Sequence, residues 1–384
     1  MRWGDTQVVI IRTILYFFSS FFPRSPRILV FGAWFGKRFS DNPRYLLDEM
    51  LKSEHFRNNQ FIWIGNRDTF PTNYDVRVQF VVRNSWKSFW YQLRAYKAFV
   101  SHGFQDLGSV SLLKGAITYQ LWHGFPVKHI GADDPGNANE GQHTYEHYQF
   151  FLANSKIMAD RIYTAFKNYG ATRNNTIVAP QPRDDYLQHN VNNANLKNKI
   201  RQKLGVSRTA IIISYLPTFR DNSEQVFYFT ENSSPRLRAY LRANHMVILE
   251  RQHFARNNQL TAVTNKQDSD LFINLTEQVE VQDVLLVTDY LISDYSSVYV
   301  DFLHLKKPII HFLYDGDNYF KNDRGLYVAD PKTEFGGPIA YSLDDLITLL
   351  KEPPEKLHQF GERLSTKLSL ASSPTLITIL ESKG

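Results

Sequence analysis

Short apolar runs alternate with helical patterns through the first half of the chain. The runs that predict strands are 28–31, 61–64, 76–82, 98–101, 117–122 and 150–153. Strand and helix in repetition are typical of a parallel sheet covered by helices on both faces. One of the helices is predicted to have Asn42 as its cap and Pro43 at its first position.

The same pattern restarts after the polar, asparagine-rich stretch 188–199, which we interpret as a linker. Further strands are predicted at 210–216, 246–250, 272–275, 290–293 and 309–313, and helices near 196–204, 235–243 and 298–305. The chain is therefore predicted to be an α/β protein with two parallel-sheet domains, 27–190 and 191–384, the second carrying a C-terminal helix. Parallel-sheet domains bind ligands at the carboxyl ends of their strands, so we expect the site in a cleft between the two domains.

Residues 1–26 form a separate apolar segment. Its apolar stretch, residues 8–22, is shorter than the roughly 20 residues that a membrane-spanning helix needs, and Arg12 interrupts it. It runs into Pro23 and Pro26 rather than into a small-residue cleavage site, so it does not resemble a secretory signal.

Read as a helix, the N-terminal segment places its polar side chains on one stripe, which consists of Arg12, Tyr16, Ser19 and Ser20. Apolar side chains occupy the rest of its surface. A helix lying in a membrane surface and a helix packed on its own domain both fit this pattern.

The composition of the chain limits the kinds of partner that it can bind and the kinds of catalytic chemistry that it can carry out. The 384 residues include 44 Lys and Arg against 38 Asp and Glu, a formal net charge of +6, which favours an anionic partner such as phosphate or a membrane face. The chain has no cysteine, which excludes disulfides, thiolate nucleophiles and cysteine-based metal sites. No nucleic-acid reading motif accompanies the basic charge, so we expect no nucleic acid as partner.

A polar turn between a predicted strand and a predicted helix contains Asp294, Ser296 and Ser297. Free N–H groups at a helix start attract anions, and two hydroxyls add donors for phosphate oxygens. The same residue types also serve as plain helix caps, so this turn alone does not decide between the two roles.

A second predicted strand ends in His123, followed by Gly124 and, further on, Lys128. A histidine titrates near neutrality, so at the edge of a cleft it is able to take a proton from an attacking hydroxyl. Gly124 lets a ligand or another backbone come close, and Lys128 favours an anionic substrate.

Other candidate groups follow strands elsewhere in the chain. His253 stands after the run 247–250, in a place that matches that of His123. Three guanidinium groups, those of Arg183, Arg220 and Arg324, are candidates for holding a diphosphate by paired hydrogen bonds. Each of them also fits an ordinary structural ion pair.

Together, these segments resemble the CDP-glycerol glycerophosphotransferases of teichoic acid synthesis, in composition and in order. The matching segments are 122–124 with Pro126 and Lys128, then 182–185, 217–221, 251–253, 292–297, 307–310, 324–327 and 337–339. The resemblance spans about residues 27–350. Departures are Phe219, Phe125 and Gln181; Phe125 beside His123 bears on the type of acceptor.

The resemblance implies a GT-B fold of two Rossmann-like domains with a cleft between them. It also implies transfer without a metal or other cofactor, and peripheral attachment to the cytoplasmic face of the cell membrane. Its donor would be CDP-glycerol and its acceptor an undecaprenyl-diphosphate-linked disaccharide. The length of the chain resembles the primase type, which adds one glycerol phosphate. A polymerising enzyme and a CDP-ribitol-using enzyme remain alternatives.

From the residues and the resemblance together, we predict His123 and His253 as catalytic groups. Gly124 and Lys128 are expected on the acceptor side, in the N-terminal domain. The donor diphosphate and nucleotide are expected in the C-terminal domain, with the predicted ligands Arg183, Arg220, Asp294, Ser296, Ser297 and Arg324. Contacts with an anionic membrane surface are predicted for Arg24, Arg27, Lys87, Arg94 and Lys97.

Three other functions fit parts of the sequence less well. Residues 143–147 spell H-x-x-E-H, the inverted zinc-peptidase pattern, but the approach to it looks like a loop rather than a long helix. Residues 32–37 resemble a phosphate loop that is one residue short and lacks the Ser or Thr that holds magnesium. A non-catalytic nucleotide-binding module is the third alternative.

Overall fold

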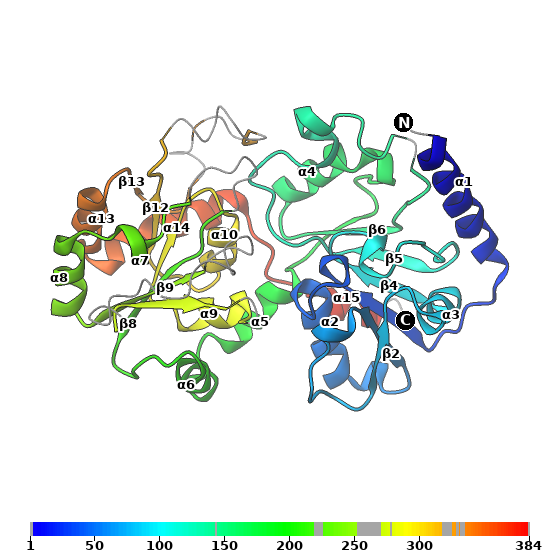
Figure 1. The fold of residues 1–384 in the computed structure, drawn as a ribbon, viewed down its shortest axis with the longest axis horizontal. Helices are drawn as coiled ribbons and strands as arrows, with labels where there is room; N and C mark the ends of the chain where they lie inside the picture. The colour runs from blue at the N-terminus through cyan, green and yellow to red at the C-terminus, as the bar shows by residue number, and fades with distance from the viewer. Residues whose placement is uncertain are drawn as a thin grey trace. The chain divides into compact units, whose positions relative to one another are not determined.

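The computed structural model describes residues 3–142, 144–218, 226–251, 270–276, 279–316, 325–327, 330 and 335–382, with side chains from residue 9 onward. These residues form an α/β protein with two compact units (Figure 1). Unit 1 consists of Met1–His123, Ile130–Asp185 and Leu370–Gly384, and unit 2 of Gly124–His129 and Tyr186–Ser369. Each unit is built around one parallel sheet.

The sheet of unit 1 has seven parallel strands in the order β3-β2-β1-β4-β5-β6-β7. They are β1 (Ile28–Gly32), β2 (Gln60–Gly65), β3 (Val78–Val82), β4 (Lys97–Val100), β5 (Ile117–Gln120), β6 (Phe150–Ala153) and β7 (Thr176–Val178). All five residues of the central strand β1 are buried, as expected for a sheet covered on both faces. The strand order reverses between β1 and β4, which makes the loops after these strands the expected ligand site of this unit.

Within the part of unit 1 that the structure describes, six helices accompany this sheet. They are α1 (Trp3–Phe18), α2 (Asp41–Lys52), α3 (Trp86–Arg94), α4 (Lys156–Ala165), α5 (Pro182–Asn190), whose second half belongs to unit 2, and α15 (Leu376–Ser382). Ser85 and Ser155 cap α3 and α4 by accepting bonds from Ser88 and Met158 backbone N–H groups.

The sheet of unit 2 has six parallel strands in the order β10-β9-β8-β11-β12-β13. They are β8 (Ile211–Tyr215), β9 (Met246–Arg251), β10 (Phe272–Leu275), β11 (Tyr290–Ser293), β12 (Ile309–Phe312) and β13 (Ile339–Ala340). Here the order reverses between β8 and β11. The helices of this unit are α6 (Ala194–Lys203), α7 (Phe229–Asn232), α8 (Pro235–Ala243), α9 (Val281–Val287), α10 (Val298–Leu303), α13 (Leu343–Leu350) and α14 (Pro354–Leu368).

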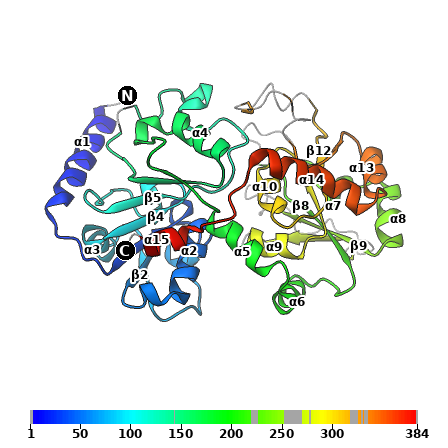
Figure 2. The ribbon, with the colours of Figure 1, turned by 180° about the vertical axis from the view of Figure 1, so that it is seen from behind.

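The end of the chain returns to unit 1, as the red α15 beside the blue α2 shows (Figure 2). Leu376 and Leu380 are buried in the same apolar cluster as Leu46 and Met50 of α2. The sequence predicts residues 370–384 in the C-terminal domain instead. A pattern of apolar positions shows that a helix has a buried face but not which sheet covers that face.

The N-terminal helix α1 and the turn after it pack on unit 1 through Tyr16 and Ser19 of the polar stripe, whereas Ser20 of that stripe is exposed. Tyr16 is 3% exposed and its ring lies 5.0 Å from that of Tyr145, and Ser19 is fully buried. The apolar side chains of α1 and the turn after it are largely exposed: Val9, Ile10, Ile11, Ile14, Leu15, Phe17, Phe18 and Phe21. Among the described helices, none has the length and apolar character needed to cross a bilayer.

The structure differs from the sequence prediction at several element boundaries. It adds β7 and β13, two edge strands of three and two residues that are too short to give a clear pattern. Helix α2 begins at Asp41 after Ser40, so the prediction of Asn42 as its cap is wrong. The asparagine-rich stretch is mostly helical, because α5 and α6 cover all but the turn 191–193 of it.

Candidate active site

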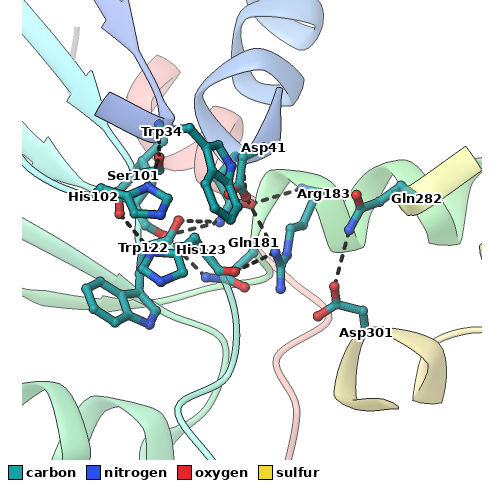
Figure 3. A network of polar contacts seen from close by, with 12 residues as sticks. Trp34, Asp41, Ser101, His102, Trp122, His123, Gln181, Arg183, Gln282 and Asp301 are labelled. Atoms are coloured by element: carbon teal, nitrogen blue, oxygen red, sulfur yellow. Dashed lines mark hydrogen bonds and ion pairs between the residues drawn. The ribbon is translucent and has the colours of Figure 1, made fainter. Parts of the chain in front are cut away.

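Three loops of unit 1, which follow strands that are neighbours in the sheet, bring aromatic and polar side chains together at the carboxyl edge of that sheet (Figure 3). Trp34 follows β1, His102 follows β4, and Trp122 and His123 follow β5. These strands are neighbours at or beside the point where the strand order reverses. The position is the one at which parallel α/β sheets bind their ligands.

His123 is held in a defined orientation. Its Nδ1 atom lies 3.2 Å from the backbone oxygen of Ser101, which can only accept a hydrogen bond. Nδ1 therefore carries the proton in the neutral ring, and Nε2 is the nitrogen left to accept one. The ring stacks on that of His102 with a centroid distance of 3.9 Å and an angle of 4° between the planes (Figure 3).

Burial keeps both imidazoles neutral. It lowers the pKa of His123, an effect that Asp41 opposes and that Arg183 reinforces. Burial also lowers the pKa of His102 far below 6.5, with smaller contributions from His123 and Arg38. At neutral pH, His123 is thus in the form that a general base requires.

An ion pair supports the loop that carries His123. Nη1 of Arg183 donates a 2.7 Å hydrogen bond to the backbone oxygen of His123 and lies 3.4 Å from Oδ1 of Asp41. Asn42 donates to the backbone oxygens of Leu121 and Trp122 at 3.2 and 2.9 Å. The first turn of α2 and the start of α5 therefore fix the backbone on both sides of the histidine.

Several residues around His123 have a left-handed backbone, which is unfavourable for side chains other than glycine. Trp34, Phe35, Asp41 and Trp122 have φ values of 50°, 56°, 67° and 58°. Such conformations cost on the order of 1–3 kcal/mol each and are found mainly at functional sites, where the surrounding contacts enforce them. Their concentration in these loops marks the site independently of its side-chain chemistry.

Asp106 is the buried anchor of two of these loops. Its carboxylate accepts from the backbone N–H groups of Phe35 at 2.6 Å and of Ser101 and His102 at 2.9 Å. A fourth backbone bond comes from Gly103, and burial raises the pKa of the Asp106 carboxyl to about 6. One side chain thus connects the loop after β1 to the loop after β4.

In unit 2, Asp294 connects the two strands that flank the reversal of strand order. Its carboxylate accepts from the backbone N–H of Thr218 at 2.9 Å, from the Thr218 hydroxyl at 2.7 Å, and from the backbone N–H of Ser296 at 3.1 Å. Thr218 follows β8 and Asp294 follows β11. Asp294 is fully buried and shapes this turn, whereas Ser296 and Ser297 are partly exposed.

His311 contacts the backbone of the same turn from the buried strand β12. Its Nδ1 lies 3.1 Å from the backbone oxygen of Asp294, and its ring stacks on Phe335 at 4.2 Å. Burial lowers its pKa to about 4, so it is a neutral part of the core. Ser297 precedes α10 and makes no side-chain capping bond there.

The remaining predicted site residues are distributed over both units. Arg183 lies beside His123 in unit 1, whereas the Ser296 turn belongs to unit 2. Gly124 and Lys128 belong to the segment Gly124–His129 of unit 2, where Lys128 pairs with Leu326 in an antiparallel bridge. Arg220, His253 and Arg324 lie outside the described residues.

Two of the predicted membrane contacts have structural roles instead. Lys97 is only 6% exposed. The guanidinium group of Arg24 donates to the backbone oxygens of Ser19, Gln92, Leu112 and Lys114. Arg27 and Lys87 are exposed, and the partly exposed Arg94 lies 5.8 Å from the ring centroid of Trp90.

The zinc-peptidase alternative lacks its helix, because residues 144–148 are not helical and His143 lies outside the described residues. No three His, Asp or Glu side chains of the described ranges are grouped in a way that fits a metal ion. The segment that resembles a phosphate loop forms a 3-10 turn, Trp34–Gly36, and the next helix begins only at Asp41. It therefore has no helix start next to Lys37 for a phosphate to bind.

Sequence reasoning missed four residues that build the His123 site: Trp34, Asp41, His102 and Asp106. A signal for His102 was present, since His102-Gly103 repeats the His123-Gly124 pair after a neighbouring strand. Asp106 had no such signal, because its role consists of bonds to backbone groups of another loop. Trp34 and Asp41 had none either, since their φ values are set by tertiary contacts.

Comparison with known proteins identifies the family of this chain and supports its fold. Residues 14–366 match the family described as CDP-Glycerol:Poly(glycerophosphate) glycerophosphotransferase. A teichoic acid glycerol-phosphate transferase of Staphylococcus aureus is 29% identical over 348 residues, which are 87% of this chain and 86% of that protein. A teichoic acid poly(glycerol phosphate) polymerase of Bacillus spizizenii is 28% identical over 355 residues, 88% of this chain and 87% of that protein.

A solved structure of the wall teichoic acid polymerase TagF, with CDPG, has a TM-score of 0.75 and 24% identity and covers 94% of this chain and 89% of that one. This likeness shows a shared GT-B-like fold. The family match extends over most of the chain and includes both units. The chain is therefore a transferase and belongs to the CDP-glycerol:poly(glycerophosphate) glycerophosphotransferase family.

Proposed function

We propose that this protein transfers glycerol phosphate from CDP-glycerol to a hydroxyl group of a lipid-linked saccharide, with release of CMP. His123 takes the proton of the hydroxyl at Nε2 while the hydroxyl oxygen attacks the phosphorus that bears glycerol. A new phosphorus–oxygen bond forms, and the bond between that phosphorus and the bridging oxygen of CDP-glycerol breaks. The electron pair leaves with CMP, and the proton on His123 passes to solvent.

The observation that carries this proposal is the bond between His123 Nδ1 and the Ser101 oxygen, which leaves Nε2 to act as acceptor. Phosphoryl transfer requires mainly alignment and neutralisation of charge, so a fixed base and fixed donors suffice for this chain's part. We assign no cofactor to the reaction. His253 keeps its predicted catalytic role, which the sequence and the family resemblance support.

The donor diphosphate is assigned to the turn after β11 in unit 2. Ser296 and Ser297 are partly exposed there, and Asp294 points its carboxylate at the backbone of the turn. A carboxylate aimed at a diphosphate would oppose its binding, so Asp294 is a structural group here. Arg220 and Arg324 are proposed to add positive charge.

CDP-glycerol is favoured over CDP-ribitol as donor because the relatives that match over most of their own length are named for glycerol phosphate. The ribitol-phosphate polymerase TarK of S. aureus matches over only 35% of its length.

The length of the chain does not separate single addition from polymerisation, since the polymerase of B. spizizenii is covered over 87% of its length. We propose single addition, in line with the teichoic acid glycerol-phosphate primase of Bacillus subtilis, which is 29% identical over 275 residues. Polymerisation is the second candidate.

A lipid-linked acceptor, such as an undecaprenyl-diphosphate disaccharide, accounts for the outward-facing apolar side of α1. Its polar stripe faces the protein, whereas Ile14 and Phe18 are 60% and 56% exposed. Binding of such a helix to a bilayer surface is favourable, because its apolar side chains leave water. Trp86 and Trp90 of α3, which are 89% and 56% exposed, and the cation of Lys87 fit the same anionic surface. This protein is thus proposed to be peripheral, on the cytoplasmic face of the membrane.

The test measures transfer of radiolabel to a lipid-linked disaccharide from two donors: CDP-glycerol labelled in its glycerol phosphate and CDP-ribitol labelled in its ribitol phosphate. Mass spectrometry of the lipid product counts the units added. We expect one glycerol phosphate per lipid and a loss of at least about 100-fold in rate for His123→Ala. Full turnover by this variant would refute the role of His123, and a ladder of products would establish the polymerase.

A further inference from the structure

We propose that His102 is a positioning residue for His123: its ring fixes the plane of the His123 ring by stacking, and this keeps His123 Nδ1 directed at the Ser101 backbone oxygen that sets the tautomer. The proposal rests on the proposed role of His123 as the base. His102 acts through His123 and has no assigned contact with a substrate.

The two rings form a parallel stack rather than a chance contact. Their planes differ by 4° and their centroids lie 3.9 Å apart, whereas Trp34 and Trp122 meet the His123 ring at 50° and 32°. An imidazole held face to face in this way cannot tilt without losing contact over its whole area. The stack therefore limits rotation of the His123 side chain about its terminal bond, which is otherwise a broad torsion.

Ser101 connects the two histidines through different atoms. Its backbone oxygen accepts from His123 Nδ1, and its hydroxyl lies 2.9 Å from His102 Nδ1. Asp106 in turn holds the backbone N–H groups of Ser101 and His102, each at 2.9 Å. The acceptor that sets the tautomer of His123 and the ring that sets its plane are thus fixed by one carboxylate.

The stack works only while His102 is neutral, because two stacked cations repel each other. The groups that face His102 enforce this state: the rings of Trp34 and Phe35 lie 4.4 and 4.9 Å away, and Arg38 is a nearby cation. His102 consequently offers an aromatic face without competing for the proton that His123 receives.

The direct test is the tautomeric state of His123, read by NMR from the 15N shifts of the whole chain labelled at histidine. His102→Ala removes the stack, and His102→Phe keeps an aromatic face without a nitrogen. His55→Ala, an exposed histidine of the same unit, serves as the control. We expect Nδ1–H in the wild type, the control and His102→Phe, and a mixture of both tautomers in His102→Ala.

Kinetics give the second readout. Displacement of His123, the proposed base, should slow the transfer step without weakening the binding of CDP-glycerol. We therefore expect His102→Ala to lower kcat by about 10–100-fold, with KM for CDP-glycerol changed by less than about twofold. His102→Phe should recover most of that loss. An unchanged tautomer in His102→Ala, or equal losses in both variants, would overturn the proposal. Since the NMR readout needs no turnover, it also decides the matter if the wild-type protein fails to transfer glycerol phosphate, which would refute the proposed function alone.

Discussion

Arg183 donates a hydrogen bond of 2.7 Å from Nη1 to the backbone oxygen of His123. The two residues are far apart in the chain, and the bond connects the start of α5 to the loop after β5. Arg183 is also within 3.4 Å of Asp41, and both side chains are less than a tenth exposed. Arg183, which was predicted to bind the donor, thus stabilises the backbone of His123, the proposed general base.

Replacement of Arg183 by Ala should destabilise the protein strongly. Loss of one partner of a buried ion pair leaves the other charge without compensation, which costs about 3–5 kcal/mol. The double variant Asp41→Asn with Arg183→Ala should cost less than the sum of the single changes, as measured by urea unfolding. Strict additivity would show that the two side chains do not interact.

The pH dependence of transfer should reflect the burial of His123. Because burial lowers its pKa, the imidazole stays unprotonated to a lower pH than an exposed histidine. We therefore expect kcat/KM to fall on the acid side with a midpoint below the ordinary value of 6.5. His55→Ala should leave this midpoint unchanged. A midpoint at or above 6.5 would contradict the assignment of the base.

Asp106 should make stability depend on pH in the acid range. Its pKa is about 6 in the folded protein against 3.8 ordinarily, so between these values the folded state binds a proton that the unfolded state lacks. The free energy of unfolding should then decrease as the pH rises from about 4 to about 6. In Asp106→Asn, this dependence should disappear.

At neutral pH, Asp106→Asn should also lower the free energy of unfolding by about 1–3 kcal/mol, because the new NH2 group faces backbone donors. Thermal or urea unfolding across pH measures both effects. Identical pH profiles for the two proteins would show that another group is responsible.

Asp294→Ala should weaken donor binding by releasing the turn that carries Ser296. Loss of the bonds to Thr218 and Ser296 removes the constraint on both loops at the reversal of strand order. We expect the KM for CDP-glycerol to rise at least about tenfold. Thr218→Val is the matched comparison, since it removes only the hydroxyl bond and should have a smaller effect. Unchanged binding of CDP-glycerol by Asp294→Ala, in calorimetry, would refute this role.

Membrane binding should depend on the exposed side of α1. Ile14→Glu places a charge on that side and should abolish sedimentation with anionic vesicles. Thr13→Glu changes a less exposed neighbour on the same helix and should have a smaller effect. Salt should weaken binding of the wild type through Lys87 and Arg27, each contributing about 1 kcal/mol. Equal sedimentation of Ile14→Glu and wild type would refute the assigned surface.

The sequence was sufficient to predict the two parallel sheets, because most strands are buried apolar runs bounded by turns. It also predicted that His123 and Asp294 follow strands, and the structure confirms these positions. It did not predict the surroundings of His123. Asp41 and Trp34 contribute through an ion pair and a left-handed backbone, which depend on residues distant in the chain.

The N-terminal segment shows a second kind of limit. Its periodicity separated a polar stripe from an apolar remainder, but the pattern alone left open which side packs on the domain. Contacts of Tyr16 with Tyr145 and the buried Ser19 show that the polar stripe faces inward. Packing, not hydropathy, determines the outward face.

Each unit contains pieces from distant parts of the chain, and this has a consequence for dissecting the protein. A fragment that ends at residue 185 would lack Leu376 and Leu380 and would expose the apolar surface of α2 to water. A fragment that begins at residue 186 would lack Gly124–His129 and the strand pairing of Lys128 with Leu326. A single cut in the chain therefore leaves neither unit whole, and co-expression of fragments or circular permutation is the route to separating them.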